Sequence, residues 1–206
     1  MPKYILGKKV GMTQIFDEKG HVVPVTLLSA GPVTVTQVIV EEKNGYTAVQ
    51  VGYGEKRLNK PELGHVKDFA AKNGKGFAIL REFRVMPENE LKKGDKLDVT
   101  QFAVGDRVNV RAATKGKGFQ GVVKRWGFKG GPKTHGQKHS LRAPGSIGSG
   151  YPQRVIKGLK MGGHMGSANK SVLRLRVAYV NPADNIIGIR GAVPGRRGAA
   201  VEIIAR

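Results

Sequence analysis

A long stretch without acidic residues constrains the fold of this chain more than any other feature. No Asp or Glu occurs between Asp106 and Asp184, and the same stretch contains 16 Lys or Arg residues. The remaining 129 residues contain 20 basic and all 15 acidic residues, a net charge of only +5. Because like charges without counter-charges oppose compaction, residues 107–183 point to a polyanionic partner.

The middle of this stretch, residues 115–166, does not have the composition of a domain that folds by itself. It contains 14 glycines and 3 prolines in 52 positions, which exceeds the roughly 25–30% found in chains that form no core of their own. Its apolar residues follow no sustained period, so few internal contacts would offset the entropy lost on ordering. We therefore predict an arm that is mobile in the free protein and becomes ordered against its partner.

The sequences on either side have the pattern of short β-strands. Val108 and Val110 alternate with polar residues, which indicates a strand with one buried and one polar face. Many short strands separated by turn residues favour a closed barrel or a sandwich. The N-terminal segment, residues 1–16, is expected to form a strand pair. The other predicted strands are Val22–Leu28, Val33–Val40, Tyr46–Tyr53, Ile79–Val85, Arg107–Arg111, Val172–Val180, Ile186–Arg190 and Ala200–Ile204.

One helix is predicted in the first half of the chain. Pro61 suits a first helical position, Leu63, Val66 and Ala70 recur at helical spacing, and Asn73-Gly74 provides a stop. The predicted fold class is therefore mainly β with one or two short helices. The domain map is a β body of residues 1–112 and 170–206, interrupted by an inserted basic extension of residues 113–169.

Composition excludes several other classes of protein. The net charge is +21, no cysteine is present, and no run of about 18 apolar residues occurs. Disulfides, cysteine-type zinc fingers and a thiol nucleophile are thereby excluded, and no membrane span is predicted. The N-terminus lacks the apolar region of a secretory signal, so we expect the protein to stay in the compartment where it is made.

The segment from Gly116 to Gly121 has the spacing G-x-G-x-x-G, which also occurs in dinucleotide-binding folds. That fingerprint needs a following helix and an acidic residue about twenty positions later. Here the residues after Gly121 form a poor helix sequence, and the next acidic residue is Asp184. The glycines are better interpreted as allowing the backbone to approach phosphate closely, beside Lys117 and Lys124.

No catalytic or metal constellation is evident. His135 and His139 are four residues apart, but Gly-Gln-Lys separates them and no acidic ligand is near. Ser146 and Ser149 lack the G-x-S-x-G elbow and a local carboxylate. We predict no metal, no cofactor and no small-molecule substrate.

Aromatic residues occur at intervals within the basic arm, and Trp126 is the most informative of them. An aromatic ring in such a context either stacks on an unpaired base or packs against the chain itself. Both interpretations of Trp126 stay open. Since no regular recognition helix is evident for a DNA groove, an irregular arm of this kind favours folded RNA.

The sequence resembles a known family, that of large-subunit ribosomal protein L-three, and its length is similar to that of the bacterial members. The resemblance extends in order over essentially the whole chain. It rests on Gly7–Phe16 at the N-terminus, on the spaced series Phe102, Asn109, Ala112, Thr114, Gly116-Lys117-Gly118, Gly121 and Arg125, and on Pro144–Gly148, Lys160–Gly166 and Gly191–Gly195.

The resemblance implies a six-stranded β-barrel of the translation-protein type, with a long extension that reaches through ribosomal RNA toward the peptidyl-transferase centre. It implies a structural, non-catalytic protein of the cytoplasmic ribosome that binds 23S ribosomal RNA near its 3′ end early in assembly and has other large-subunit proteins as neighbours. The limbs of the extension would be Lys115–Arg142 and Arg154–His164, with the apex at about residues 148–152. Some bacterial relatives carry a methylated glutamine at the apex, where Ser149 and Gly150 stand here, and Gln153 is the nearest candidate for modification.

The candidate RNA-binding residues all lie in this extension, and each has a basic, amide, imidazole or indole side chain. They are Lys115, Lys117, Gln120, Lys124, Arg125, Trp126, Lys129, Lys133, His135, Lys138, His139, Arg142, Arg154, Lys157, Lys160 and His164, and the apex residues are Gly148, Ser149, Gly150 and Tyr151. Two alternatives are an architectural nucleic-acid-binding protein outside the ribosome, with DNA or RNA as its ligand, and an RNA-modifying enzyme. The enzyme would need a cofactor cradle and an acid or base constellation that the sequence does not offer.

Overall fold

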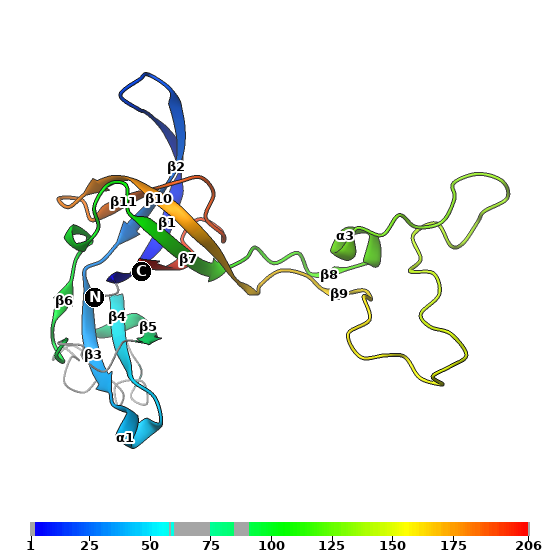
Figure 1. The fold of residues 1–206 in the computed structure, drawn as a ribbon, viewed down its shortest axis with the longest axis horizontal. Helices are drawn as coiled ribbons and strands as arrows, with labels where there is room; N and C mark the ends of the chain where they lie inside the picture. Colours follow the sequence, from blue (N-terminus) through cyan, green and yellow to red (C-terminus); the bar gives the residue numbers. More distant parts are fainter. Residues whose placement is uncertain (1–2, 58, 60–74, 85–90, 206) are drawn as a thin grey trace. The chain divides into compact units, whose positions relative to one another are not determined.

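The computed structural model describes residues 3–57, 59, 75–84 and 91–205. These residues form two compact units (Figure 1). The first comprises the chain up to Ala113 together with Asn169 onward, and the second is Thr114–Ala168. The first unit contains β1 (Lys3–Phe16), β2 (Val22–Ala30), β3 (Val33–Ile39), α1 (Glu41–Asn44), β4 (Ala48–Arg57), β5 (Lys75–Arg84), β6 (Lys96–Leu97), the short 3-10 helix η2 (Val99–Gln101), β7 (Arg107–Ala113), β10 (Asn169–Asn181), β11 (Ile186–Arg190) and β12 (Ala200–Ala205). The second contains β8 (Phe119–Gln120), α3 (Val122–Trp126) and β9 (Gly163–His164).

Six strands of the first unit close into a barrel in the order β1-β12-β7-β10-β11-β2. Every neighbouring pair is antiparallel, and the last strand of the chain pairs with the first, so that Tyr4 lies opposite Ile204. Closure leaves the barrel without the unpaired edges of an open sheet. The prediction of a mainly β fold is confirmed, and so is the six-stranded barrel that the family resemblance implied.

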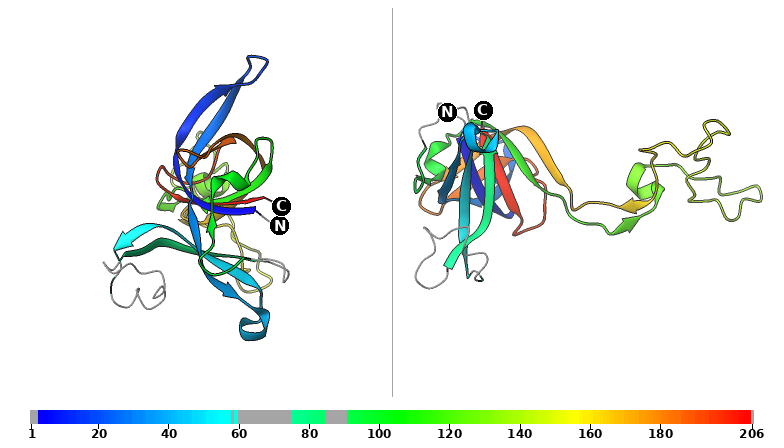
Figure 2. Two further views of the ribbon diagram at one scale, coloured as in Figure 1. Left: turned by 90° about the vertical axis from the view of Figure 1, so that its left-hand side faces the viewer. Right: turned by 90° about the horizontal axis from the view of Figure 1, so that it is seen from below.

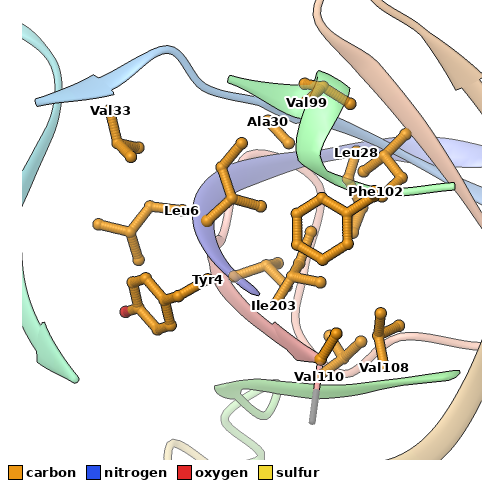
Figure 3. Packing of buried hydrophobic residues seen from close by; sticks show 14 of the residues in the cluster. Tyr4, Leu6, Leu28, Ala30, Val33, Val99, Phe102, Val108, Val110 and Ile203 are labelled. Carbon is orange, nitrogen blue, oxygen red and sulfur yellow. The ribbon is translucent and has the colours of Figure 1, made fainter. Parts of the chain in front are cut away.

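The barrel interior is filled by the apolar residues of the alternating strands. In β7, Val108 and Val110 are fully buried, while Arg107 and Arg111 are exposed. Val110 lies opposite Ile203 of β12, which in turn lies opposite Ile5 of β1. Figure 3 shows Phe102, which follows η2, among Leu28, Val108, Val110 and Ile203. The period-2 pattern that was visible in the sequence is therefore the pattern of the core.

A second sheet, with strand order β5-β4-β3-β6, covers the outer face of β1. Figure 3 shows Tyr4 and Leu6 on the side of Val33 of this sheet. Because successive side chains of a strand point to opposite faces, Ile5 between them faces the barrel interior, on the same face as its partner Ile203. The ring of Tyr4 stacks on Phe83 of β5 with centroids 4.1 Å apart and an interplanar angle of 17°. Both faces of β1 are thus buried here, which explains its unbroken run of buried residues.

The N-terminus differs from its prediction. Instead of a strand pair, residues 3–16 form the single long strand β1, with an irregularity between Lys9 and Gly11. Gly7 lies inside this strand and does not make a turn. A Cβ at Gly7 would lie 2.6 Å from the carbonyl O of Ser29. The glycine instead permits close approach of β2, and the outer half of β1 continues beyond the barrel as a hairpin with β2 (Figure 2, blue).

Helices are few and short in the part of the chain that the structure describes. The helix predicted from Pro61 to Gly74 lies outside the described residues, as does Val85 at the end of a predicted strand. Glu41 and Glu42 begin the one-turn helix α1, which ends at Gly45 in the left-handed conformation. No described helix has the length and hydropathy needed to cross a bilayer.

Candidate nucleic-acid interface

The second unit, called the extension below, begins and ends at neighbouring positions of the barrel wall. The ladder of β7 and β10 ends with Ala113 opposite Asn169. The pairing continues directly into the extension, where the amide of Thr114 donates to the carbonyl O of Ala168 at 2.9 Å and its Oγ1 donates to the same oxygen at 3.1 Å. The two limbs of the extension are therefore held in register by the barrel strands from which they arise.

The limbs then approach each other through glycine. The amide of Lys117 donates to the carbonyl O of Met165, and the amide of Met165 donates to the carbonyl O of Gly118, both at 2.9 Å. Gly166 has φ +82°, and a Cβ at this position would lie 2.1 Å from the carbonyl O of Lys115. Only glycine fits this backbone contact without a shift. Strands β8 and β9 complete the paired part, with Phe119 opposite His164.

A short helix follows, although the residues after Gly121 form a poor helix sequence. Val122–Trp126 form α3, and Gly127 ends it with φ 74° while its amide donates to the carbonyl O of Val123. Val122 is 4% exposed, so the turn is fixed by burial of its first side chain. A helix of five residues with no acidic residue before Asp184 does not form a dinucleotide site, although the glycine spacing is present.

Trp126 and Arg125 connect the helix to the other limb. The indole Nε1 of Trp126 and the Nη1 of Arg125 each donate to the carbonyl O of Met161 at 2.8 Å. The Arg125 guanidinium lies 5.0 Å from the centroid of the indole ring, and the Lys160 ammonium lies 5.8 Å from it. The indole N–H is thus used within the chain, while 43% of the side chain is exposed. The sequence carried no signal for Met161, because its contribution is a backbone oxygen.

Beyond α3, the predicted first limb Lys115–Arg142 contains a closed loop. The amide of Gly131 donates to the carbonyl O of Leu141 at 3.0 Å and closes a separate loop. Gly130 makes this closure possible, since a Cβ there would lie 2.2 Å from the same oxygen. Figure 1 shows this loop and a second one after it. The closed loop presents four candidate residues with exposed side chains, Lys133, His135, Lys138 and His139.

The second loop contains the predicted apex. Gly148 and Ser149 are exposed there, and the Tyr151 side chain is 86% exposed. The Oγ of Ser146 donates to the carbonyl O of Gly148 at 2.9 Å, which makes a local turn. Gln153 is exposed as well, and its modification stays a prediction.

The extension presents its basic side chains without any counter-charge of its own. Residues 114–168, all of which the structure describes, contain 11 Lys or Arg residues and no Asp or Glu. Among the candidate residues only Gln120 and Arg125 are partly buried; Gln120 donates to the carbonyl O of Lys117, and the other 14 are exposed. The extension can therefore offer phosphate oxygens a dense set of cationic donors on a backbone fixed by glycine contacts.

Comparison with known proteins agrees with this geometry. Residues 65–192 match the family described as ribosomal protein L3. The chain is 46% identical to the large ribosomal subunit protein uL3 of Desulforapulum autotrophicum, over 98% of each chain. It is 47% identical to the protein of the same name in Chlorobaculum tepidum, over 98% of this chain and 97% of that one, and 47% identical to that of Desulfotalea psychrophila over the full length of both. With a family match over more than half of its residues and relatives of this similarity over its whole length, the chain belongs to the ribosomal protein L3 family.

Proposed function

We propose that this chain, which as a family member is a structural constituent of the large ribosomal subunit and not an enzyme, binds 23S ribosomal RNA directly through its extension. In this proposal the binding site lies near the 3′ end of the RNA, the protein joins the subunit early in assembly, and the extension is directed toward the peptidyl-transferase centre. Its other partners are neighbouring large-subunit proteins, and its place is the ribosome in the cytoplasm.

One observation carries the proposal: the extension has 11 Lys or Arg residues and no acidic residue, and most of its charged side chains are exposed. In isolation these charges repel one another, and phosphate neutralises them while condensed counterions are released. The same composition leaves few apolar contacts inside the unit, so a surrounding partner would supply much of its ordering.

The shape of the backbone favours folded RNA over duplex DNA. Reading a DNA major groove takes a helix or a two-stranded ribbon that presents several side chains to base edges. The extension has one helix of five residues and two irregular loops beyond it. Irregular chain with planar Arg, His and Trp side chains suits unpaired bases and 2′-hydroxyl groups. The second candidate, an architectural DNA-binding protein, shares only the charge.

Hydroxyl-radical footprinting of large-subunit RNA with the full-length protein tests the proposal. We expect protection of a limited region near the 3′ end, and we expect Lys133→Gln with Lys138→Gln to weaken it without unfolding the protein. Salt-matched competition with duplex DNA of equal length supplies the comparison. Absence of protection, or equal affinity for DNA, would contradict RNA binding as the function.

A further inference from the structure

The hairpin of β1 and β2 extends past the closed part of the barrel. The ladder of β1 with β12 ends at Lys8, and the ladder of β2 with β11 begins at Val25. Beyond these points the two strands make ladder pairs only with each other among the described residues, as far as Phe16 opposite Val22. Residues 10–24 are called the ribbon below (Figure 2, blue). Because a two-stranded ribbon is only marginally stable in water by itself, this geometry favours a working state in which a partner covers it.

One face of the ribbon is apolar and open to solvent. Phe16 and Val22 lie opposite each other, so their side chains share a face, and they are 67% and 54% exposed. Met12 and Pro24 belong to the same face by the period of two residues, and both are exposed as well. Ile15, on the other face, is partly buried. The exposed apolar side chains are therefore gathered on one side of the ribbon.

The ribbon is poor in cations, unlike the chain as a whole. Its charged residues are Asp17, Glu18 and Lys19, which gives a net charge of −1 with His21 neutral, in a chain with a net charge of +21. The Oδ1 of Asp17 is engaged in the turn, where it accepts the amides of Lys19 and His21 at 3.0 and 2.8 Å. The carboxylate of Glu18 is exposed and has no ion-pair partner in the part of the chain that the structure describes. A free acid thus lies at the end of the apolar face.

These two properties select the class of partner. Phosphate contacts to RNA are made mainly by Lys and Arg, whereas RNA at this ribbon would meet apolar side chains and two carboxylates. A protein interface has an apolar core in which aromatic residues are enriched, surrounded by a polar rim. Phe16 beside Val22 has the properties of such a core. Glu18 has those of a rim residue, which a basic residue of the partner complements.

We propose that the exposed face of the ribbon is the docking surface for a neighbouring protein of the large subunit, one that presents an apolar patch bordered by Lys or Arg. Phe16 is the apolar anchor of this contact, and Glu18 pairs with a cation of the partner. The inference rests on the proposed presence of neighbouring large-subunit proteins and names the surface on which one of them lies. The extension takes no part in it.

The first test is photocrosslinking in purified large subunits that contain the full-length chain. p-Benzoylphenylalanine replaces Phe16 in one variant and, in the control, Val104, which is equally exposed but lies outside the ribbon. We expect the probe at Phe16 to form an adduct with one large-subunit protein, on a peptide with apolar residues beside Lys or Arg, and the probe at Val104 not to label that peptide. An adduct with ribosomal RNA or with a second copy of this chain, or no adduct from Phe16, would overturn the docking surface.

The second test measures the affinity of the protein identified in this way, purified, for variants of the full-length chain in the absence of RNA. Phe16→Ser removes the anchor and should weaken binding by a factor of about 10 or more, whereas Val104→Ser should leave the affinity unchanged. Glu18→Lys keeps the apolar face and reverses the charge, so we expect a several-fold loss. Glu42→Lys is its control at an exposed acid outside the ribbon.

Equal affinities of the two serine variants would overturn the role of Phe16 as anchor, and with it the docking surface. Equal affinities of the two lysine variants would overturn the pairing of Glu18 with a cation. Circular dichroism checks that all four variants are folded, and their affinity for large-subunit RNA should be unchanged because none of the substitutions lies in the extension. Failure of the unaltered protein to bind RNA would contradict the proposed RNA-binding function, whereas the adduct from Phe16 tests the ribbon by itself.

Discussion

The indole Nε1 of Trp126 donates a hydrogen bond to the carbonyl O of Met161 at 2.8 Å, and this bond joins the helix of one limb to the backbone of the other. Arg125 donates to the same oxygen, and its guanidinium lies over the indole ring. The indole N–H of Trp126 is therefore used within the chain, as the packing interpretation expects. The part of the ring that remains exposed can still contact a ligand, so the stacking interpretation stays open for it.

Trp126→Phe should loosen the connection between the limbs. The ring is kept in part, but the donor to Met161 is lost, at a cost of about 0.5–1.5 kcal/mol for a single hydrogen bond. We expect faster hydrogen exchange at the amides of Lys117 and Met165, which pair the limbs, and unchanged exchange in the barrel. Because Trp126 is the sole tryptophan, its fluorescence in the unaltered protein reports on the same site. Unchanged exchange at both amides would contradict the structural role of this bond.

Gly166→Ala should disrupt the paired part of the extension more than Gly118→Ala. Both glycines have a positive φ, +82° and +65°, so both variants carry the backbone strain of about 1 kcal/mol that a Cβ brings there. A Cβ at Gly166 would also meet the carbonyl O of Lys115 at 2.1 Å, whereas nothing lies within 4 Å of one at Gly118. RNA affinity and NMR shifts of residues 114–120 should change strongly only in Gly166→Ala. Equal effects of the two substitutions would show that strain alone matters.

Tyr4→Phe should not destabilise the barrel, although Tyr4 is 1% exposed. Its hydroxyl is buried and has no hydrogen-bond partner among the described residues, so its removal relieves a desolvation cost of about 1–3 kcal/mol in part or in full. Chemical denaturation at pH 7 should give a free energy of unfolding that is equal or higher for the variant. A loss of more than about 1 kcal/mol would indicate a partner for the hydroxyl.

The same residue predicts a dependence on alkaline pH. Burial, and then the nearby charge of Glu202, raise the pKa of Tyr4 well above its ordinary value of 10.0. The neutral phenol is favoured in the folded state. Ionisation of Tyr4 therefore leaves the free energy of unfolding unchanged below pH 10. Above pH 10 the phenol ionises in the unfolded chain first, and the free energy of unfolding falls by about 1.4 kcal/mol per pH unit. Tyr4→Phe should lack this decline. The difference between the two unfolding curves between pH 9 and 11 isolates Tyr4 from the other tyrosines.

RNA binding should depend steeply on salt. If the extension neutralises on the order of 10 phosphates, log K falls with log salt with a slope of about −7 to −9. Filter binding between 50 and 300 mM salt measures it, with a protein lacking residues 129–143 as the comparison. A slope near −2 would indicate that the exposed charges of the extension face solvent in the complex.

Strand predictions succeeded where a single local pattern determined burial. Val108 and Val110 alternate with polar residues, and the strand that they predict is present. The alternation holds because β7 has one face in the core and the other outside it, so that successive side chains are buried and exposed in turn. The pattern failed at β1, where the outer sheet buries Tyr4 and Leu6 on the face opposite Ile5 and removes the alternation. It failed also at α3, where burial of Val122 and the left-handed Gly127 stabilise one turn that propensity disfavours.

The sequence by itself determined the unequal distribution of charge, the glycine-rich composition of residues 115–166 and the motifs that resemble the family, because these depend only on the order of residues. Tertiary structure alone decided which side chains come together. Lys8, Lys75 and Lys96 line one cleft because barrel closure and the second sheet bring β1, β5 and β6 to a common junction. The acid-free stretch, in turn, is divided between the exposed faces of β7 and β10 and the extension proper, whose backbone contacts require glycine at Gly130 and Gly166. Charge is additive along a chain, whereas proximity is produced by folding.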